Sequence, residues 1–311
     1  MWRRSDSRRF LPTHIGKRFR GASFHIPAED RDVRKGSGVR LDGHGMSQIG
    51  RTRRVNQDQF FIQALAACQA NCFLGVADGI GGGPGGTAAA LDVIDTIQDF
   101  VKEKSKLLLH PERSDGEMLE TLTRGLKRCR HVLAGNVQHR PEHSGMGTTL
   151  TAALVIWPKF YLIHMGDSRA YLLRNGELQR LTRDHTYGQA LMDAGFLNWK
   201  TLQTSRWKSV VSNFLGEKTP DEGPEVHPDI HIERLRPGDT VFLCTDGVTD
   251  LITDKEIDRI LSNPGSTEDQ CRSLLNLVRD RGARDDATAM IARFMAAEGS
   301  PGTRRNSRTS V

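Results

Sequence analysis

The sequence predicts an α+β protein in which helices pack outside antiparallel sheets. Two observations carry this prediction: hairpin signals that join adjacent β-type segments, and long segments with apolar residues at helical spacing. Strands joined by tight turns run antiparallel, whereas a doubly wound parallel sheet needs a helix between successive strands. The sequence therefore favours antiparallel sheets covered by helices.

The β-type segments are short and apolar, and turn residues bound them. Residues 71–77 have the continuous apolar composition of a buried strand that ends at an aspartate. A clear antiparallel set is predicted at 148–156, 159–165, 169–174 and 177–182. The last two flank Asn175-Gly176, a hairpin signal in which both central residues must accept positive φ. Further strands are predicted at 240–245 and 287–294.

Two longer segments, 87–106 and 117–138, have helical periodicity. The first places apolar side chains three or four positions apart, at Leu91, Ile94, Ile97 and Val101. A shorter helix is predicted over 255–262, with Asp254 as its N-cap. Because residues 40–295 contain no internal repeat and no linker-like stretch, a single domain is the simplest organisation.

The composition is that of a globular protein, with 37% hydrophobic and 26% charged residues. No apolar run is long enough to span a membrane, and the N-terminus lacks the apolar stretch of a secretory signal. We therefore expect a soluble, cytoplasmic protein with no membrane span. The five cysteines are scattered and do not form the paired spacing of a zinc site, so we expect small buried side chains in a reducing compartment.

The net charge of +6 is concentrated at the two ends of the chain. Residues 1–54 carry 14 Lys and Arg against 5 Asp and Glu, whereas the region that follows is mildly acidic. We expect a basic, flexible extension over 1–37, a folded domain over 38–296 and a basic, flexible tail over 297–311. Such arms could contact an anionic partner, but nothing in the central region predicts base recognition. We therefore expect no specific nucleic-acid partner.

Aspartates recur where apolar segments end, beside glycine or a small residue. They occur in Asn56-Gln57-Asp58, Asp78-Gly79, Gly166-Asp167, Asp246-Gly247 and Asp285-Asp286. If these carboxylates met in space they would repel, and some would stay protonated at neutral pH unless cations neutralised them. Carboxylates without neighbouring His or Cys suit Mg²⁺ or Mn²⁺ better than zinc. Each motif alone is equally well explained as an ordinary turn.

Together, these motifs resemble in order and spacing the metal-dependent protein phosphatases of the 2C type (PPM family), and most closely the bacterial branch. The resemblance covers about residues 40–295. Its motifs are Arg53-x-x-Asn56-Gln57-Asp58, Asp78-Gly79-Ile80-Gly81-Gly82, Gly145-Met146-Gly147-Thr148-Thr149, Gly166-Asp167-Ser168-Arg169, Thr182-Arg183-Asp184-His185, Thr245-Asp246-Gly247-Val248-Thr249-Asp250 and Asp285-Asp286-Ala287-Thr288. The resemblance implies a four-layer α-β-β-α sandwich, with two central antiparallel sheets flanked by helices and a metal cleft at one edge.

The same resemblance implies hydrolysis of phosphoserine and phosphothreonine on proteins with two Mn²⁺ or Mg²⁺ ions. Asp78 would bridge the ions, and the Gly79 carbonyl would bind one of them. Asp246 and Asp285 would hold the other, while Asp58 would support the first ion directly or through water. Paired ions lower the pKa of a shared water and orient it for in-line attack, so no phospho-enzyme is needed.

Two further site residues have open alternatives. Arg53 matches the family's phosphate-binding arginine and has the spacing to Asp58 that this role implies, but it also fits a solvated basic run. Asp167 matches the position of a third cation in bacterial relatives, and a tight turn between strands is the structural alternative. His185 follows this region and is expected to fix the entry to the next helix.

The sequence departs from the family pattern at three positions. Gln57 stands where many members carry Glu, Ile80 stands where eukaryotic members have a His, and Asp286 stands where Asn is common. The first two keep open a catalytically weak or inactive member that acts as a binding or regulatory module. The third is expected to alter only the surroundings of the ligands.

Residues 186–216 correspond to the variable flap of the family. Its aromatic residues Trp199, Trp207 and Phe214 would either meet a substrate protein or pack onto the domain. The expected partners are a phosphoprotein substrate and a partner Ser/Thr kinase, and the expected state is a monomer.

Overall fold

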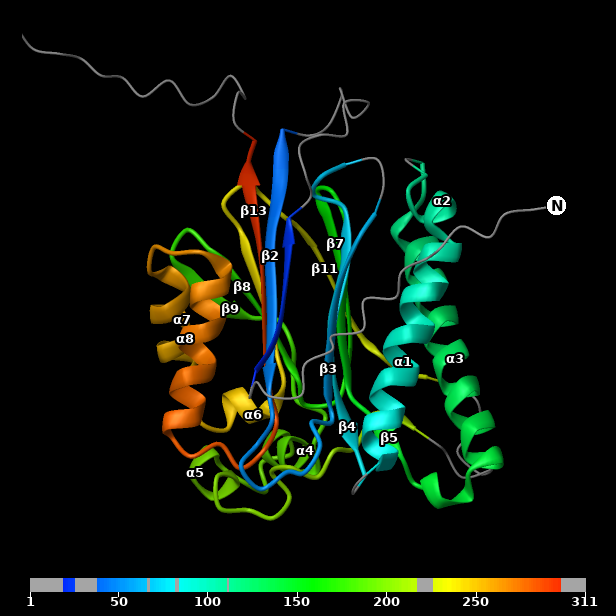
Figure 1. Cartoon of the computed structure of the whole chain (residues 1–311), viewed down its shortest axis with the longest axis vertical. Coiled ribbons are helices and arrows are strands. Elements are labelled where there is room, and N and C mark those ends of the chain that lie inside the picture. Colours follow the sequence, from blue (N-terminus) through cyan, green and yellow to red (C-terminus); the bar gives the residue numbers. More distant parts are fainter. Residues whose placement is uncertain are drawn as a thin grey trace, which may run out of the picture.

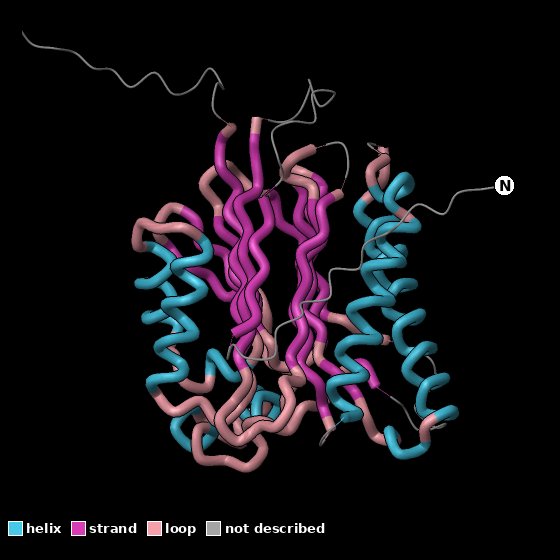
Figure 2. Tube along the Cα trace, in the orientation of Figure 1, coloured by secondary structure: helices cyan, strands magenta, loops and turns pink. Residues whose placement is uncertain are grey.

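The computed structural model describes residues 19–25, 38–65, 68–81, 84–110, 112–216 and 226–297. Within these ranges, the strands form two antiparallel sheets that pack face to face, and helices cover the outer face of each sheet (Figure 1). Figure 2 shows the two sheets between two helical layers. The predicted α-β-β-α sandwich is confirmed. No helix in these ranges is long and apolar enough to cross a membrane.

The first sheet has six strands in the order β1-β2-β13-β12-β8-β9. These are β1 (Phe19–His25), β2 (Val39–Gln48), β13 (Ala287–Ala296), β12 (Thr240–Cys244), β8 (Arg169–Arg174) and β9 (Glu177–Arg180). The turn between β8 and β9 is formed by Asn175 and Gly176, whose φ values of 53° and 79° are both positive, as the hairpin signal predicted.

Strand β1 lies inside the segment that was expected to be a flexible extension. Its residues pair antiparallel with β2 along its whole length, from Phe19 opposite Gln48 to His25 opposite Asp42. The expectation of a wholly flexible arm was wrong for this stretch, because backbone pairing to a sheet edge needs no strong apolar pattern. The rest of the extension and residues 298–311 lie outside the described residues, so the domain limits stay predictions.

The second sheet follows the path β10-β5-β4-β6-β7-β11, and β3 pairs with β4 beside this path. Its strands are β3 (Asp58–Ala64), β4 (Cys72–Ile80), β5 (Gly147–Thr148), β6 (Leu150–Ile156), β7 (Lys159–Met165), β10 (Leu215–Gly216) and β11 (Asp229–Arg234). Consecutive strands β7 and β8 belong to different sheets, so the single antiparallel set predicted over 148–182 was wrong at this point. Gly166, with φ of 117°, lies in the connection between the sheets.

The helices lie in two outer layers and at one end of the sandwich (Figure 1). They are α1 (Pro84–Glu103), α2 (Ser105–Leu108), α3 (Asp115–His139), the 3₁₀ turn η1 (Pro141–His143), α4 (Tyr187–Asp193), α5 (Trp199–Leu202), α6 (Asp246–Thr249), α7 (Asp254–Ser262) and α8 (Thr267–Asp280). The N-cap of α7 is Thr253, not Asp254 as predicted. The Glu256 carboxylate accepts hydrogen bonds from the backbone N–H of Thr253 at 3.0 Å and from the Thr253 hydroxyl at 2.8 Å. These bonds fix the helix start one residue earlier than the sequence predicted.

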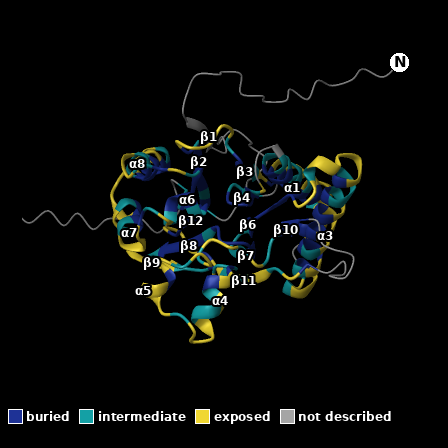
Figure 3. Cartoon of the chain, turned by 90° about the horizontal axis from the view of Figure 1, so that it is seen from below, coloured by how far each residue is buried: buried dark blue, intermediate teal, exposed yellow. Residues whose placement is uncertain are grey.

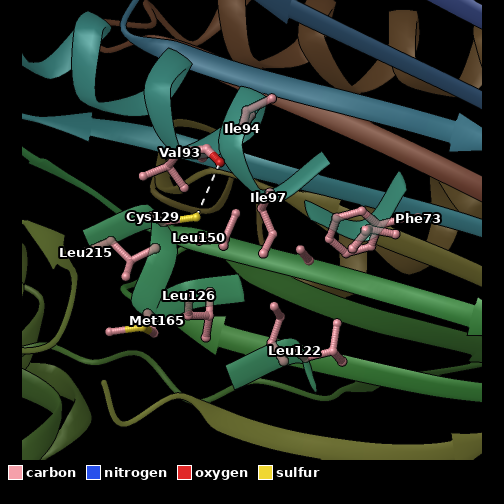
Figure 4. Packing of buried hydrophobic residues seen from close by; sticks show 14 of the residues in the cluster. Phe73, Val93, Ile94, Ile97, Leu122, Leu126, Cys129, Leu150, Met165 and Leu215 are labelled. Atoms are coloured by element: carbon pink, nitrogen blue, oxygen red, sulfur yellow. Dashed lines mark hydrogen bonds between the residues drawn. The ribbon is translucent and has the colours of Figure 1, made fainter. Parts of the chain in front are cut away.

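The core between α1, α3 and the second sheet is apolar and tightly interdigitated (Figure 4). Labelled there are Phe73, Val93, Ile94, Ile97, Leu122, Leu126, Cys129, Leu150, Met165 and Leu215.

Leu91 was expected on this face but is 43% exposed, because the buried stripe of α1 runs through Val93 and Ile97. All five cysteines are free, and four of them are buried as expected, whereas Cys68 is only partly buried.

The two sheets meet in a second core, and this packing explains the unusual composition of β2. Gly43 and Gly45 of β2 face Ile62 and Phe60 of β3, respectively. A Cβ atom at Gly45 would lie 2.4 Å from the Phe60 ring, so the glycine leaves the space that the aromatic side chain fills. Strand β2 therefore has a buried face without a hydrophobic sequence pattern.

Candidate active site

The predicted carboxylates lie close enough to repel one another electrostatically, and one of them, Asp246, begins α6. Helix α6 lies with α4 and α5 at one end of the sandwich, which Figure 3 views from below. Asp58 is the first residue of β3, and its direct antiparallel partner in β4 is Asp78. Residues opposite each other in such a pair have Cα atoms about 4.5–5.5 Å apart. The strand register alone therefore makes these two carboxyl groups neighbours.

Asp58 is tied to the first sheet by two hydroxyl groups. Its Oδ2 atom accepts hydrogen bonds from Thr245 Oγ1 at 2.8 Å and from Thr288 Oγ1 at 2.7 Å. Thr245 directly precedes Asp246 at the start of α6, and Thr288 lies near the start of β13. These bonds bring Asp246 and the Asp285-Asp286 segment to the same end of the molecule as Asp58.

Glycines allow two close backbone approaches at this end. A Cβ atom at Gly247 would lie 1.9 Å from the Asp286 carbonyl oxygen, so only glycine lets α6 pack against this segment. A Cβ atom at Gly79 would lie 2.3 Å from the Gly86 carbonyl oxygen at the start of α1. The Asp-Gly motifs thus have a packing reason, in addition to the predicted ligand role of the Gly79 carbonyl.

The main chain of Asp78 is held by the Thr148-Thr149 motif. Its carbonyl accepts from the Thr149 backbone N–H at 2.9 Å and from Thr148 Oγ1 at 2.8 Å, and its N–H donates to Thr149 Oγ1 at 3.0 Å. Three hydrogen bonds therefore fix the backbone that carries the central carboxylate.

Enclosure by the protein raises the pKa values of these carboxyl groups. Loss of hydration is the largest cause, and the neighbouring carboxylates add to it. The pKa of Asp58 rises to about 8 and that of Asp246 to about 7. The pKa values of Asp78 and Asp167 are also raised, for the same two reasons. Such a cluster strongly favours a bound cation, because positive charge offsets both the desolvation and the repulsion.

Two carboxylate oxygens in this cluster are suited to a metal ion. Asp58 Oδ1 and Asp246 Oδ1 are buried and have no hydrogen-bond partner among the described residues. A buried acceptor without a donor is energetically unfavourable, and a hard divalent cation is the partner that such oxygens prefer. The residues therefore fit Mn²⁺ or Mg²⁺.

Asp285 lies at the edge of the cluster and pairs with Arg53. Arg53 Nη2 lies 2.7 Å from Asp285 Oδ2 and 2.6 Å from Oδ1, and both side chains are about two-fifths exposed. In the part of the chain that the structure describes, no three Asp, Glu, His or Cys side chains form a ready metal-binding group. The ligand roles of Asp58, Asp78, Gly79, Asp246 and Asp285 therefore stay predictions.

Gln57 positions Arg53 from the other side. Arg53 Nη1 donates to Gln57 Oε1 at 2.8 Å, and Gln57 Nε2 donates to the Gly81 carbonyl at 3.0 Å. The amide therefore links the arginine to the chain that follows β4. A glutamate could not make the second bond, since an ionised carboxylate has no N–H to donate.

Asp286 has a role that the sequence did not reveal. Its Oδ1 atom accepts from the Gly50 N–H at 2.9 Å and its Oδ2 atom from the Gln57 N–H at 2.8 Å. One buried carboxylate thus holds both ends of the loop that carries Arg53. The sequence signal was only the acidic residue itself, whose partners are 236 and 229 positions away.

Asp167 lines a cavity beside the flap. This cavity is also lined by Asp246, Asp250, Arg169 and Lys208. Arg169 makes two hydrogen bonds to Asp184, at 3.0 and 2.7 Å, and Lys208 Nζ lies 2.8 Å from Asp250 Oδ1. The structure therefore brings Asp167 to the same cavity as Asp246, while a third ion at Asp167 stays a prediction.

His185 and the flap aromatics divide into packed and exposed groups. The His185 N–H donates to the Gly166 carbonyl at 2.7 Å, and its ring lies 3.0 Å from Asp229, so it fixes the chain before α4. The Phe214 ring packs over Gly147, where a Cβ atom would lie 2.5 Å from it. Trp199, by contrast, is 61% exposed.

The fold and the site together define a class of proteins. A two-sheet sandwich holds buried carboxylates at one end, beside an arginine, and this arrangement suits hard divalent cations bound next to an anion. The family model of protein phosphatase 2C matches residues 45–292. The chain therefore belongs to the protein phosphatase 2C family, as the sequence motifs indicated.

The relatives agree with this assignment. Serine/threonine protein phosphatase PstP of Mycobacterium tuberculosis is 32% identical over 246 residues, which are 79% of this chain and 43% of PstP. The chain thus spans less than half the length of this curated relative. The crystal structure of M. tuberculosis PstP/Ppp superimposes with a TM-score of 0.70 at 30% identity, covering 81% of this chain and 98% of that one. A structure of the PstP catalytic domain in complex with two manganese ions has a TM-score of 0.68 at 30% identity and covers 83% of this chain and 99% of that one.

Proposed function

We propose that this protein hydrolyses phosphoserine and phosphothreonine on protein substrates with the help of two Mn²⁺ or Mg²⁺ ions. The observation that carries the proposal is the pair of buried, unpartnered oxygens of Asp58 and Asp246, which lie in one carboxylate cluster beside Arg53. The relative with two bound manganese ions supports the same metal content here.

The proposed ligands divide between two ions as the family pattern implies. Asp78 would serve both ions, the Gly79 carbonyl and Asp58 would hold the first, and Asp246 and Asp285 would hold the second. When bound, the ions supply the positive charge that lowers the pKa of a shared water and offsets the charge of the phosphoryl group. A third ion at Asp167 would extend the same cluster toward the flap.

Arg53 is the residue that we propose to bind the phosphoryl group. Its Nη2 atom already contacts both oxygens of the Asp285 carboxylate, and a planar guanidinium can likewise donate to two phosphate oxygens. Gln57 keeps the guanidinium oriented through Nη1, and Nη2 would exchange its contact with Asp285 for one with the phosphoryl group when Asp285 binds an ion. Because the arginine is already oriented, it can stabilise the negative charge that develops in the transition state without a rearrangement of the loop.

The departures from the family pattern are compatible with activity. Gln57 retains the contact to Arg53, and Ile80 lies in the β4–β5 pairing opposite Gly147. A non-catalytic binding module would have no use for the buried carboxylates, which are unfavourable for folding without a cation. The kinase partner, the monomeric state and the cytoplasmic location stay predictions.

A manganese titration of phosphopeptide turnover tests the proposal, with wild type beside Asp246→Asn. We expect wild-type turnover to require added Mn²⁺, and we expect the variant to need at least about tenfold more Mn²⁺ for half-maximal rate. Asp99→Asn on the exposed face of α1 is the matched control and should behave as wild type. Metal-independent turnover, or none with p-nitrophenyl phosphate and phosphopeptides alike, would refute the proposal.

A further inference from the structure

A cationic cavity lies beside Arg53, on the side away from the flap. Its volume is about 480 Å³, and it is bounded by the loop after β2 and by the C-terminal end of α8. The lining residues are Gln48, Ile49, Gly50, Arg51, Arg53, Arg279 and Ala283. The titratable residues among them are all arginines. A cavity of this composition suits an anion.

The walls of this cavity are tied together by hydrogen bonds. The Arg51 N–H donates to the Ala283 carbonyl at 2.9 Å, and Arg51 Nη2 donates to the Arg279 carbonyl at 3.2 Å. Thr52 Oγ1 donates to the Arg284 carbonyl at 2.6 Å. Together with the Asp286 bond to Gly50, these contacts hold the arginine-bearing loop against the end of α8. The cavity is therefore a built feature of the fold.

The surroundings add positive charge. Arg54 and Arg284 are exposed next to the cavity in sequence. Three acids offset part of this charge: Asp285 pairs with Arg53, Asp280 lies 3.4 Å from Arg279, and Asp286 accepts the two backbone bonds of its clamp. Apolar Ile49 and Ala283 in the lining reduce local hydration, which strengthens the attraction between an anion and the guanidinium groups.

Arg53 belongs to both sites, since it lines this cavity and pairs with Asp285 at the carboxylate cluster. An anion in the cavity would therefore lie beside the phosphoryl group that Arg53 is proposed to bind. Building on the proposed function, we infer that the cavity binds a second anionic group of the substrate, a phosphate or carboxylate within a few residues of the scissile phosphate. The substrates are then acidic or multiply phosphorylated segments.

Turnover of matched peptides tests this inference. Each peptide carries one phosphothreonine and, at one of the three positions on either side, Gln, Glu or a non-hydrolysable phosphonate analogue of phosphoserine. We expect kcat/KM to rise about tenfold from Gln to the phosphonate at the best position, the effect of one or two charge-assisted hydrogen bonds. Raising the ionic strength should reduce this ratio.

Variants of the arginines that line the cavity test whether the preference for a second anionic group arises there. In Arg51→Gln and Arg279→Gln the phosphonate-to-Gln ratio should fall toward one, and in Arg51→Glu it should fall below one. Arg128→Gln on α3, which removes an exposed arginine paired with Glu103, is the matched control and should keep the wild-type ratio. A ratio that is unchanged in the Arg51 and Arg279 variants would overturn the inference.

A binding measurement separates this inference from the proposed function. Fluorescence anisotropy with a labelled phosphonate peptide, without divalent ions, should show about tenfold weaker affinity for Arg51→Glu than for wild type. If no peptide is hydrolysed but this difference persists, the proposed function is wrong and the cavity assignment stands. Equal affinities would overturn the assignment. If inorganic phosphate displaces the labelled peptide as effectively as unlabelled peptide does, the cavity binds free phosphate and the proposed substrate role is overturned.

Discussion

The two sides of the carboxylate cluster differ in charge and in construction. On the Arg53 side, a loop held at both ends by Asp286 presents arginines to a cavity. On the flap side, Asp167, Asp246 and Asp250 line a cavity whose cations are already paired, Arg169 with Asp184 and Lys208 with Asp250. Because the two cavities differ in the charge of their lining, we expect anionic groups of a substrate on the first side and cations on the second.

The two sides also differ in how firmly they are attached. The Arg53 loop is fixed by two buried hydrogen bonds to Asp286, the residue before β13, and by an exposed hydrogen bond to the Arg279 carbonyl at the end of α8. The flap contains two short helices, α4 and α5, and the exposed Trp199 is the first residue of α5, whereas Phe214 packs on the domain. We therefore expect substitutions on the loop side to affect stability and activity together, and those on the outer flap to leave stability unchanged.

The largest expected effect comes from Asp78→Asn, which removes the carboxylate proposed to bridge the ions. Turnover should fall at least about 100-fold, since a disturbed metal site usually loses one or two orders of magnitude. The metal-free variant should melt at a higher temperature than metal-free wild type, because one member of a mutually repelling cluster is gone. Calorimetry with and without Mn²⁺ measures both the melting temperature and its metal dependence. A variant that Mn²⁺ still stabilises as strongly as wild type would show that Asp78 is no ligand.

Asp286→Ala tests the clamp on the Arg53 side. It leaves two buried backbone N–H groups without acceptors, and we expect a loss of about 3 kcal/mol in the free energy of unfolding. Asp286→Asn keeps one acceptor oxygen and should lose about half as much. Urea unfolding measures stability, and KM for a phosphopeptide reports the position of Arg53. Unchanged KM in a folded Asp286→Ala protein would mean that other contacts suffice to hold the loop.

The pH dependence of unfolding tests the buried histidine near the flap. Burial, together with the nearby His185, lowers the pKa of His164 to about 4, while the Arg183 carbonyl, Asp184 and Asp229 oppose this shift. Because the pKa of His164 is lower in the folded protein than in the unfolded chain, the unfolded chain binds the proton at a higher pH as the pH falls. The stability is therefore complete above pH 6.5 and is lost as pH falls from 6.5 toward 4, by at most about 3 kcal/mol.

Urea unfolding across this pH range should show a smaller slope for His164→Gln than for wild type. His139→Gln at an exposed helix end is the control for removal of an imidazole. Identical slopes in wild type and His164→Gln would place the titrating group elsewhere.

The smallest expected effect is that of Trp199→Ala on the outer flap. Because the side chain is mostly exposed, the free energy of unfolding should change by no more than about 0.5 kcal/mol. Phe214→Ala is the comparison, with an expected loss of about 2 kcal/mol from its packing over Gly147. A large destabilisation by Trp199→Ala would remove the distinction between a firm loop and a loosely attached flap.

Strands β7 and β8, the Asn175-Gly176 hairpin and helices α1 and α3 were predictable from sequence, because apolar periodicity and turn chemistry depend on near neighbours. The aspartates of the site were also identifiable from their motifs. The crossing from one sheet to the other at Gly166 was not, since a strand pattern does not record which sheet a strand joins. Helix α8 and the edge strand β11 were not predicted either.

The sequence by itself determined the family, the local elements and the residue types of a divalent-cation site. Only the tertiary structure decided which groups meet: Asp58 with Thr245 and Thr288, and Asp286 with the backbone of Gly50. The same holds for β2, whose glycines are buried because Phe60 and Ile62 occupy the space above them. The hydrogen-bonded partners named here lie 187 to 236 positions apart and leave no local pattern, because their contact exists only once both sheets have packed together.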